Sequence, residues 1–366
     1  MEPEYTPKTE FDGVSGFIQT GPRGEVTDAD HADILRECGY DPSKVRIVGN
    51  PRISRWQRFD GEWLSAYRFH IESTESIPAW NLDELIEVAK AASFKQCLKE
   101  PGDGTIRVLQ VGDLQLGKRE NGPDGIGDLL KRYMRTLDAF VETIQPGQPV
   151  LVAHVGDCIE GIVSQGGKNQ GYQTPLTGTE MVRVYRRLLM ETVTTIAPHT
   201  NELVVAVVNG NHDEAQRQLN TKPGDGWATE SAIAVKDALE LAGGYEHVRV
   251  VVPPERQGHL TTKVGNTIFT IMHGHQLPRP GGCAGAEKWL KDAAFYQQPA
   301  AGAHFVLFGH FHQFQALTSG PRTFLCSNTY DGGSDWFAEH NGGAWQQPFA
   351  TAFTTHGGQL LDLQPI

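Results

Sequence analysis

Five apolar segments of strand length in this chain each lead into residues that commonly bind metals. The clearest is the run of residues 203–208, which continues into Asn-Gly-Asn-His-Asp at residues 209–213. An unbroken apolar run is typical of a buried strand, and open α/β sheets place their chemistry at the carboxyl ends of such strands. There, Asn211 offers an amide oxygen to a hard cation, His212 titrates near neutral pH, and Asp213 can orient an imidazole ring.

Four further runs end in the same kinds of residue. They are residues 106–111 before Asp113 and Gln115, 150–155 before Asp157 and Glu160, 268–272 before His273 and His275, and 305–308 before His310 and His312. A polar turn after a strand would explain one such segment, but five together indicate a metal site. Two divalent ions about 3.5–4 Å apart neutralise a phosphodiester anion and lower the pKa of a bound water toward about 7.

In chain order the five motifs are D-x-Q, G-D-x-x-E, G-N-H-D, H-G-H and G-H-x-H, and this set resembles the calcineurin-like metallophosphoesterase superfamily. The resemblance covers residues 106–328. Motif order and spacing look most like the DNA double-strand-break repair nuclease branch, particularly its compact phage-type forms. The resemblance implies a two-sheet α/β sandwich that gathers its ligands on loops at one edge.

The resemblance also implies a role for each motif residue. One ion would be held by Asp113, Gln115, Asp157 and His312, and the other by Asp157, Asn211, His273 and His310. Asp157 would bridge the two ions, and His212 would protonate the leaving oxygen with Asp213 as its orienting partner. Mn²⁺ is the expected metal, with Mg²⁺, Fe²⁺ and Zn²⁺ as alternatives.

Gln115 departs from the family pattern, which has a histidine at this position. A neutral amide binds borderline ions less well than imidazole does. The first metal site is therefore expected to be weaker, to prefer a harder ion, or to fill only with substrate present. If Gln115 does not bind metal, it would instead support a ligand or contact the substrate.

The helical patterns and turn signals place the sandwich in the larger part of the chain. Helices are predicted at residues 129–144, 179–196 and 229–241, each after a motif strand. We expect a small α+β unit at residues 1–72, a linker with a helix at residues 73–104, and the catalytic domain at residues 105–366.

The small N-terminal unit is predicted to hold a helix at residues 29–38 and a hairpin. Strands at residues 53–59 and 63–71 flank Asp60-Gly61, a strong hairpin signal. This hairpin interleaves aromatic residues with arginines, a mixture that suits base stacking and phosphate binding. We interpret the aromatics as the core of the unit, and leave open whether the arginines bind a ligand or form a solvated face.

Composition narrows the class of protein. The 366 residues carry a formal net charge of −12, which weighs against a broad grip on duplex DNA. Five cysteines without a C-x-x-C pair argue against a disulfide framework. No secretory signal and no membrane-spanning apolar run is visible, so a cytoplasmic protein without a membrane partner is expected.

Three functional classes fit these patterns. The first is a nuclease with DNA as its substrate. The second is a phosphodiesterase or phosphatase for a nucleotide or another small phosphoester, which the acidic charge favours. The third is a non-catalytic binding protein that has lost a metal, for which Gln115 is the only support.

Overall fold

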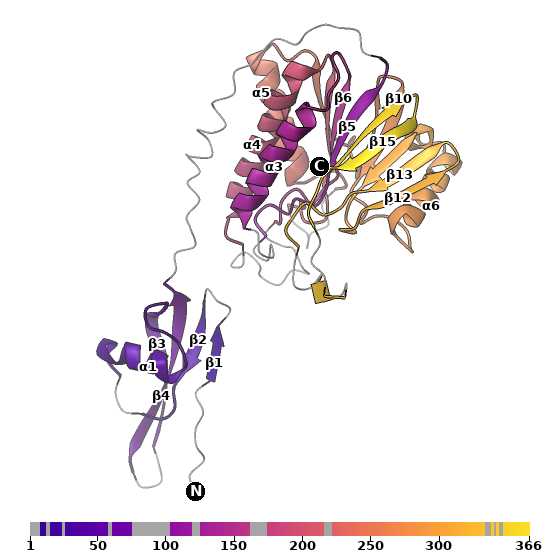
Figure 1. The fold of residues 1–366 in the computed structure, drawn as a ribbon. Coiled ribbons are helices and arrows are strands. Elements are labelled where there is room, and N and C mark those ends of the chain that lie inside the picture. The colour runs from indigo at the N-terminus through magenta and orange to yellow at the C-terminus, as the bar shows by residue number, and fades with distance from the viewer. Residues whose placement is uncertain are drawn as a thin grey trace. The chain divides into compact units, whose positions relative to one another are not determined.

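The chain forms two compact units in the computed structural model, Met1–Leu82 and Asp83–Ile366, and we call them the N-terminal and C-terminal units (Figure 1). The structure describes residues 8–11, 15–23, 26–57, 61–74, 103–118, 125–161, 174–215, 222–333, 338–339, 342–343 and 347–366. The helix expected at residues 81–99 lies outside these ranges. The division between the units falls at residue 82, which lies within the linker predicted at residues 73–104.

The N-terminal unit is a four-stranded antiparallel sheet with one helix packed on one face. Across the sheet, the order is β1 (Lys8–Phe11), β2 (Ser15–Gln19), β4 (Trp63–Ser73) and β3 (Val45–Gln57). The 3-10 turn η1 (Asp28–Asp30) leads into α1 (His31–Glu37), whose Ile34 and Leu35 pack on alternate residues of β4. The predicted hairpin is present, and its first strand begins earlier than expected because residues 45–48 pair with the far end of β4.

The first sheet of the C-terminal unit has six strands. Their order is β15 (Gln359–Pro365), β14 (Thr351–His356), β5 (Ile106–Val111), β6 (Val150–His154), β7 (Leu203–Val207) and β8 (Val248–Val251). β5 to β8 run parallel, and β14 joins β5 in antiparallel orientation. The C-terminal tail, whose position the sequence leaves undetermined, therefore forms two strands of this sheet.

The second sheet has five strands. Their order is β12 (Gln315–Ser319), β13 (Arg322–Cys326), β11 (Phe305–Phe308), β10 (Thr267–Met272) and β9 (His259–Val264). β10, β11 and β13 are parallel to one another. The inward side chains of both sheets form one apolar core, in which Val108 and Val204 of the first sheet join Phe269 and Leu307 of the second.

Helices cover the outer faces of the two sheets. α3 (Ile126–Val141), α4 (Gly178–Ile196) and α5 (Trp227–Ala242) lie on the outer side of the six-stranded sheet, and α6 (Gly282–Phe295) packs on the five-stranded one (Figure 1). Two 3-10 turns, η3 (Ala197–His199) and η5 (Pro299–Gly302), complete the described elements. The expected two-sheet α/β sandwich is confirmed. In the part of the chain that the structure describes, no helix is long and apolar enough to span a bilayer.

Local sequence explains where these helices begin and end. Thr177 caps α4 through a reciprocal capping box with Glu180, which satisfies free backbone N–H groups. α3 lies three residues earlier in the chain than predicted. The helix ends before Thr143 and Ile144. The N–H groups of these two residues donate to the carbonyl groups three residues earlier, which is the pattern of a tight turn after a helix.

Candidate metal centre

The predicted ligands come together because they follow strands that end at one edge of the sandwich. β5, β6 and β7 are parallel neighbours in one sheet, and β10 and β11 are parallel neighbours in the other. The loops after β5 and β6 continue the pairing beyond the sheet, since the Gln115 N–H donates to the Asp157 carbonyl at 2.8 Å. This contact fixes the first two motifs against each other.

The backbone at these positions is strained. Seven non-glycine residues in the described part of the chain have φ in the left-handed region, and five of them are predicted ligands. The five are Asp113 (53°), Gln115 (42°), Asp157 (49°), His310 (73°) and His312 (57°). Such conformations cost about 1–3 kcal/mol each, and they cluster at functional sites where the surrounding structure enforces them.

Glycines in the motifs leave space for the ligands. A Cβ on Gly210 would lie 1.9 Å from Asp157 Oδ1, and one on Gly156 would lie 2.7 Å from His273 Nδ1. Gly156 also has a φ of +93°, which L-residues rarely adopt. The motifs therefore require glycine here for both space and backbone conformation.

Three side chains of the predicted second site form a compact cluster. Ligand atoms of Asp157, His273 and His310 lie within 4.8 Å of one another. His273 Nδ1 lies 2.8 Å from the Val155 carbonyl oxygen, and a proton donated there leaves Nε2 to face Asp157 Oδ2 at 3.1 Å. A histidine that binds metal through one nitrogen commonly donates from the other in this way.

The fourth predicted ligand, Asn211, stands between Gly210 and His212, whose backbone N–H donates to Asp157 Oδ1. The amide oxygen of Asn211 is buried and has no hydrogen-bond partner among the described residues. An unpartnered buried oxygen is costly in a folded protein and commonly marks a missing water or ion. Carboxylate, amide oxygen and imidazole nitrogens together form a donor set that suits Mn²⁺ and related divalent ions. The residues of this site fit a divalent cation.

Protonation of the two histidines differs. Burial lowers the pKa of His310 to about 4, so its imidazole is neutral and can bind metal. Burial also opposes the charged form of His273, but the Asp157 carboxylate raises its pKa to about 9. A cation at Asp157 would compete with that proton.

The predicted first site is arranged differently. His312 Nε2 lies 3.3 Å from Asp113 Oδ1, as two ligands of one ion would. The Gln115 amide oxygen, however, accepts a hydrogen bond from Lys118 Nζ at 2.6 Å. Lys118 also pairs with the buried carboxylate of Asp331. The atom that Gln115 would offer to a metal is thus already bonded to an ammonium group.

His212 lies beside the cluster, with Glu160 as its partner. Its Nδ1 is 3.2 Å from Glu160 Oε2, its Nε2 is 3.9 Å from Asp157 Oδ2, and its backbone N–H donates to Asp157 Oδ1. Burial disfavours the charged ring, but the charge of Asp157 and the contact with Glu160 raise the pKa of His212 to about 9. A protonated imidazole at the mouth of the cluster can act as a general acid.

The expected role of Asp213 as the partner of His212 is wrong. The Asp213 carboxylate accepts backbone N–H groups from Gly210, Cys158 and Ile159 at 2.7–3.2 Å. These bonds join the loop after β7 to the loop after β6. Asp213 therefore holds the two loops together, because a buried carboxylate is stabilised by several N–H donors.

A hollow of about 390 Å³ opens beside the cluster. It is lined by Gly210 and His275 from the motif loops and by Lys222 and Arg256 from neighbouring segments. The lining also includes Glu214 and Asp225, so the hollow carries two cationic and two acidic side chains. His275 is exposed, and its ring centre lies 5.5 Å from that of His273.

The family model for calcineurin-like phosphoesterases matches residues 106–349, which is more than half of the chain. The chain belongs to this family. It is therefore a metal-dependent phosphoesterase, and the matched residues include all five motifs. No curated protein matches the chain in sequence.

Several solved structures resemble the C-terminal part of this phosphoesterase at low identity. Vps29 from Cryptosporidium parvum is 16% identical, covers 72% of this chain and 99% of its own, and has a TM-score of 0.35. A Vps29 variant from Entamoeba histolytica is 14% identical over 71% and 98%, with a TM-score of 0.34. An archaeal phosphodiesterase is 13% identical over 71% and 100%, with a TM-score of 0.36. Such low values say nothing about substrate or partners.

Sequence reasoning missed three residues of this centre. Glu160 ends the G-D-x-x-E motif, and its place three residues after Asp157 gives no sign that it contacts His212. Lys118 stands three residues after Gln115, but Asp331, which holds it, is 213 residues away in the chain. Cys158, beside Asp157, was not missed: it is a buried free thiol, as a packing residue would be, and burial raises the pKa of this thiol.

Proposed function

We propose that this phosphoesterase hydrolyses the phosphodiester bonds of DNA, as expected for the double-strand-break repair nuclease branch that its motifs resemble. The observation that carries hydrolysis is the cluster of Asp157, His273 and His310, with His212 beside it. The loop of His212 adds Asn211, whose amide oxygen is buried without a hydrogen-bond partner among the described residues. A divalent cation in this cluster would neutralise the phosphate and activate water, and Mn²⁺ is the ion that we propose.

The residues of the chain have separate tasks in this reaction. Asp157, Asn211, His273 and His310 would hold the cation, and the strained loops keep them in position. His212 donates a proton from Nε2 to the departing oxygen, while its Nδ1 is held by Glu160. Asp213 keeps the two loops in register, so that the proton donor and the ligands stay at a fixed distance.

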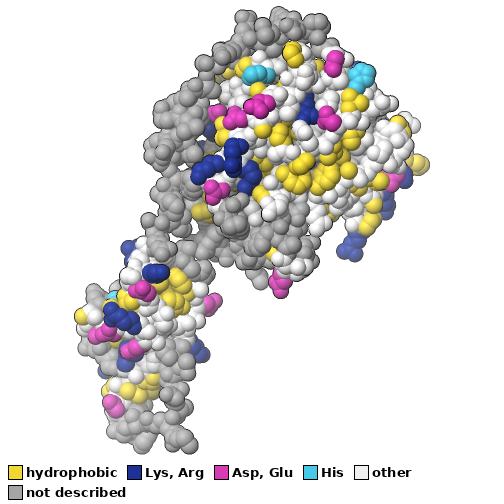
Figure 2. Space-filling view, viewed as in Figure 1, with side chains coloured by type: hydrophobic (Ala, Val, Ile, Leu, Met, Phe, Trp, Pro, Cys, Tyr) yellow, Lys and Arg dark blue, Asp and Glu magenta, His cyan; other side chains and the backbone are white. Residues whose placement is uncertain are grey.

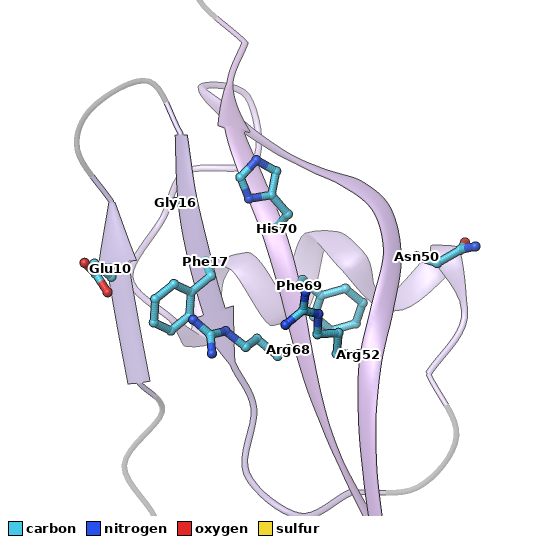
Figure 3. A pocket seen from close by; sticks show the side chains of 8 residues that line it. All are labelled: Glu10, Gly16, Phe17, Asn50, Arg52, Arg68, Phe69 and His70. Carbon is cyan, nitrogen blue, oxygen red and sulfur yellow. The ribbon is translucent and has the colours of Figure 1, made fainter. Parts of the chain in front are cut away.

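Support for DNA as the substrate comes from the open face of the N-terminal sheet. Phe17, Arg68 and His70 lie in front of this sheet, with the helix behind it (Figure 3). They line a hollow of about 550 Å³ together with Arg52, which stands directly opposite Arg68 across the strands. The Arg68 guanidinium lies 3.5 Å from the centre of the Phe17 ring. We call these four residues the open-face cluster.

Charge on this face is unbalanced. Neither Arg52 nor Arg68 forms an ion pair with a described carboxylate, although Glu10 also lines the hollow. Glu72, two residues along β4 from His70, pairs with Arg46 at 3.4 Å, so this carboxylate is already bonded to another cation. Four further acidic residues of the unit, Asp30, Asp33, Glu37 and Asp41, lie in or beside the segment of α1.

Guanidinium groups without a carboxylate partner among the described residues, beside the half-buried Phe17 ring, suit the phosphates and bases of a single strand. On the face in Figure 2, basic and acidic side chains of the C-terminal unit are interspersed and form no continuous basic band. This charge distribution favours local contacts with a single strand over extended non-specific binding of duplex DNA.

Hydrolysis is tested with protein stripped by a chelator and reloaded with Mn²⁺. The substrates are single-stranded DNA, duplex DNA, single-stranded RNA, a cyclic nucleotide and an aryl phosphodiester. We expect metal-dependent cleavage of the aryl substrate and of single-stranded DNA. Cleavage of the cyclic nucleotide with no action on DNA would replace the proposal with a small-molecule phosphodiesterase. A preference for RNA would replace DNA as the substrate.

Binding is tested separately by fluorescence anisotropy of labelled single-stranded DNA. Arg52→Ala/Arg68→Ala should weaken binding and reduce the salt slope by about 1.4, since each lost phosphate contact contributes about 0.7 for single strands. The matched control, Arg36→Ala/Lys236→Ala, removes two cations that already sit in helical ion pairs. Equal weakening in both variants would show that only net charge matters, and would refute a binding role for the open-face cluster.

A further inference from the structure

The two predicted metal positions of this phosphoesterase are unequal. At the second position, Asn211 keeps a buried amide oxygen without a hydrogen-bond partner among the described residues. At the first position, the equivalent oxygen of Gln115 accepts from Lys118 at 2.6 Å. The amide oxygen at the second position thus has no hydrogen-bond partner among the described residues, and the amide oxygen at the first position is already bonded to an ammonium group.

Lys118 is held firmly in this place. Its side chain is 8% exposed, and its ammonium group pairs with Asp331, whose side chain is 0% exposed. Asp331 is itself fixed, because its Oδ1 accepts from Thr329 Oγ1 and from the Gly333 N–H at 3.1 Å. Burial opposes the charged form of Asp331, yet Lys118 and His312 keep its pKa below the usual range.

The chemistry of the lysine decides what Gln115 can do. An ammonium group carries three donors and no acceptor, so it binds the oxygen of the amide and not its nitrogen. A divalent cation on that same oxygen would lie against the ammonium charge, and like charges at this separation repel strongly in a buried site. Gln115 therefore does not serve as a metal ligand while Lys118 keeps its position.

We propose that Lys118 acts as a fixed cation at the first position, so that this phosphoesterase holds one divalent ion tightly, at Asp157, Asn211, His273 and His310. Asp113 and His312 then bind a second ion weakly, with Gln115 outside its shell. Lys118 is a positioning residue, which orients the Gln115 amide and pairs with Asp331.

The test counts metal ions without substrate, so its result is independent of whether DNA is cleaved. Stripped protein is titrated with Mn²⁺, and bound metal is measured by elemental analysis and by electron paramagnetic resonance. We expect one tightly bound Mn²⁺ per chain, with the hyperfine signal of an isolated ion, and a second that binds about tenfold or more weakly. Two ions of similar affinity with an exchange-coupled signal would overturn the proposal.

The variant Lys118→Met provides the second test of the proposal. The substitution removes the cation and leaves the Gln115 oxygen free, so the second ion should bind more tightly and the coupled signal should appear. Lys131→Met is the control, because Lys131 is an exposed lysine on α3 that pairs with a neighbour on the same helix, Asp128. A folded Lys118→Met protein, judged by circular dichroism, that still holds one ion would refute the role of Lys118. If that variant does not fold, the Mn²⁺ titration of the wild-type protein alone decides whether the proposal holds.

Discussion

Replacing Glu160 by Gln tests whether this residue acts through His212. The contact joins His212 Nδ1 to Glu160 Oε2 at 3.2 Å. A hydrogen bond to a charged group contributes about 1.5–3 kcal/mol, whereas a neutral one contributes about 0.5–1.5 kcal/mol. The difference of about 1–1.5 kcal/mol predicts that Glu160→Gln lowers kcat about tenfold, since 1.36 kcal/mol corresponds to a factor of ten.

The assay is steady-state hydrolysis of an aryl phosphodiester by Mn²⁺-loaded protein, with metal content measured in parallel. His212→Ala should lower kcat about 10²- to 10⁴-fold and keep its metal, because a general acid contributes about that much. In the His212→Ala background, Glu160→Gln should have no further effect. If the second substitution slows that variant tenfold again, Glu160 acts on the metal or the substrate and the reasoning is refuted.

Asp213→Asn is the contrasting variant for this experiment. The carboxylate accepts backbone N–H groups from Gly210, Cys158 and Ile159, and an amide cannot accept from all of them. An unsatisfied buried donor costs about 1–3 kcal/mol. Asp213→Asn should therefore lower Tm by several degrees, and its effect on kcat should be the same with or without His212.

Four further substitutions test the metal cluster by metal analysis. Asp157→Asn should remove the tightly bound ion, and retention of a full equivalent would show that Asp157 is not a ligand. His273→Ala should lose the ion and His275→Ala should keep it, because only His273 belongs to the cluster within 4.8 Å; the reverse result would exchange their roles. Gly210→Ala should lower both metal content and Tm, because its Cβ would lie 1.9 Å from Asp157 Oδ1; an unchanged Tm would mean that the loop relaxes freely.

Much of this fold and centre could be predicted from sequence because strand ends carry the ligands. Apolar runs gave the motif strands to within a residue, and parallel strands bring Asp157, His273 and His310 together at one edge. What could not be predicted depends on contacts between loops. Asp213 is next to His212 in sequence, but its side chain points to amides of the loop after β6. The partner of Lys118 lies in the C-terminal tail, and no local pattern identifies it.

The neighbours of the arginines in the N-terminal hairpin could not be predicted either, because they depend on strand register. β3 is irregular between Val48, which pairs with His70, and Arg52, which pairs with Arg68. Without this bulge Asn50 would stand opposite Arg68. Pro51 lacks an N–H and Gly49 has a φ of +69°, so the backbone cannot continue the regular ladder there. The bulge places two like charges directly opposite each other.

This register leads to a prediction with opposite signs for stability and binding. Like charges directly opposite in a sheet are destabilising by about 0.2–1 kcal/mol. Arg52→Gln should therefore slow amide hydrogen exchange in β3 and β4 of the full chain, and at the same time weaken binding of single-stranded DNA. An arginine that only stabilised the sheet would give faster exchange. Faster exchange with unchanged DNA binding would make Arg52 a structural residue and remove the main support for a nucleic-acid site on this face.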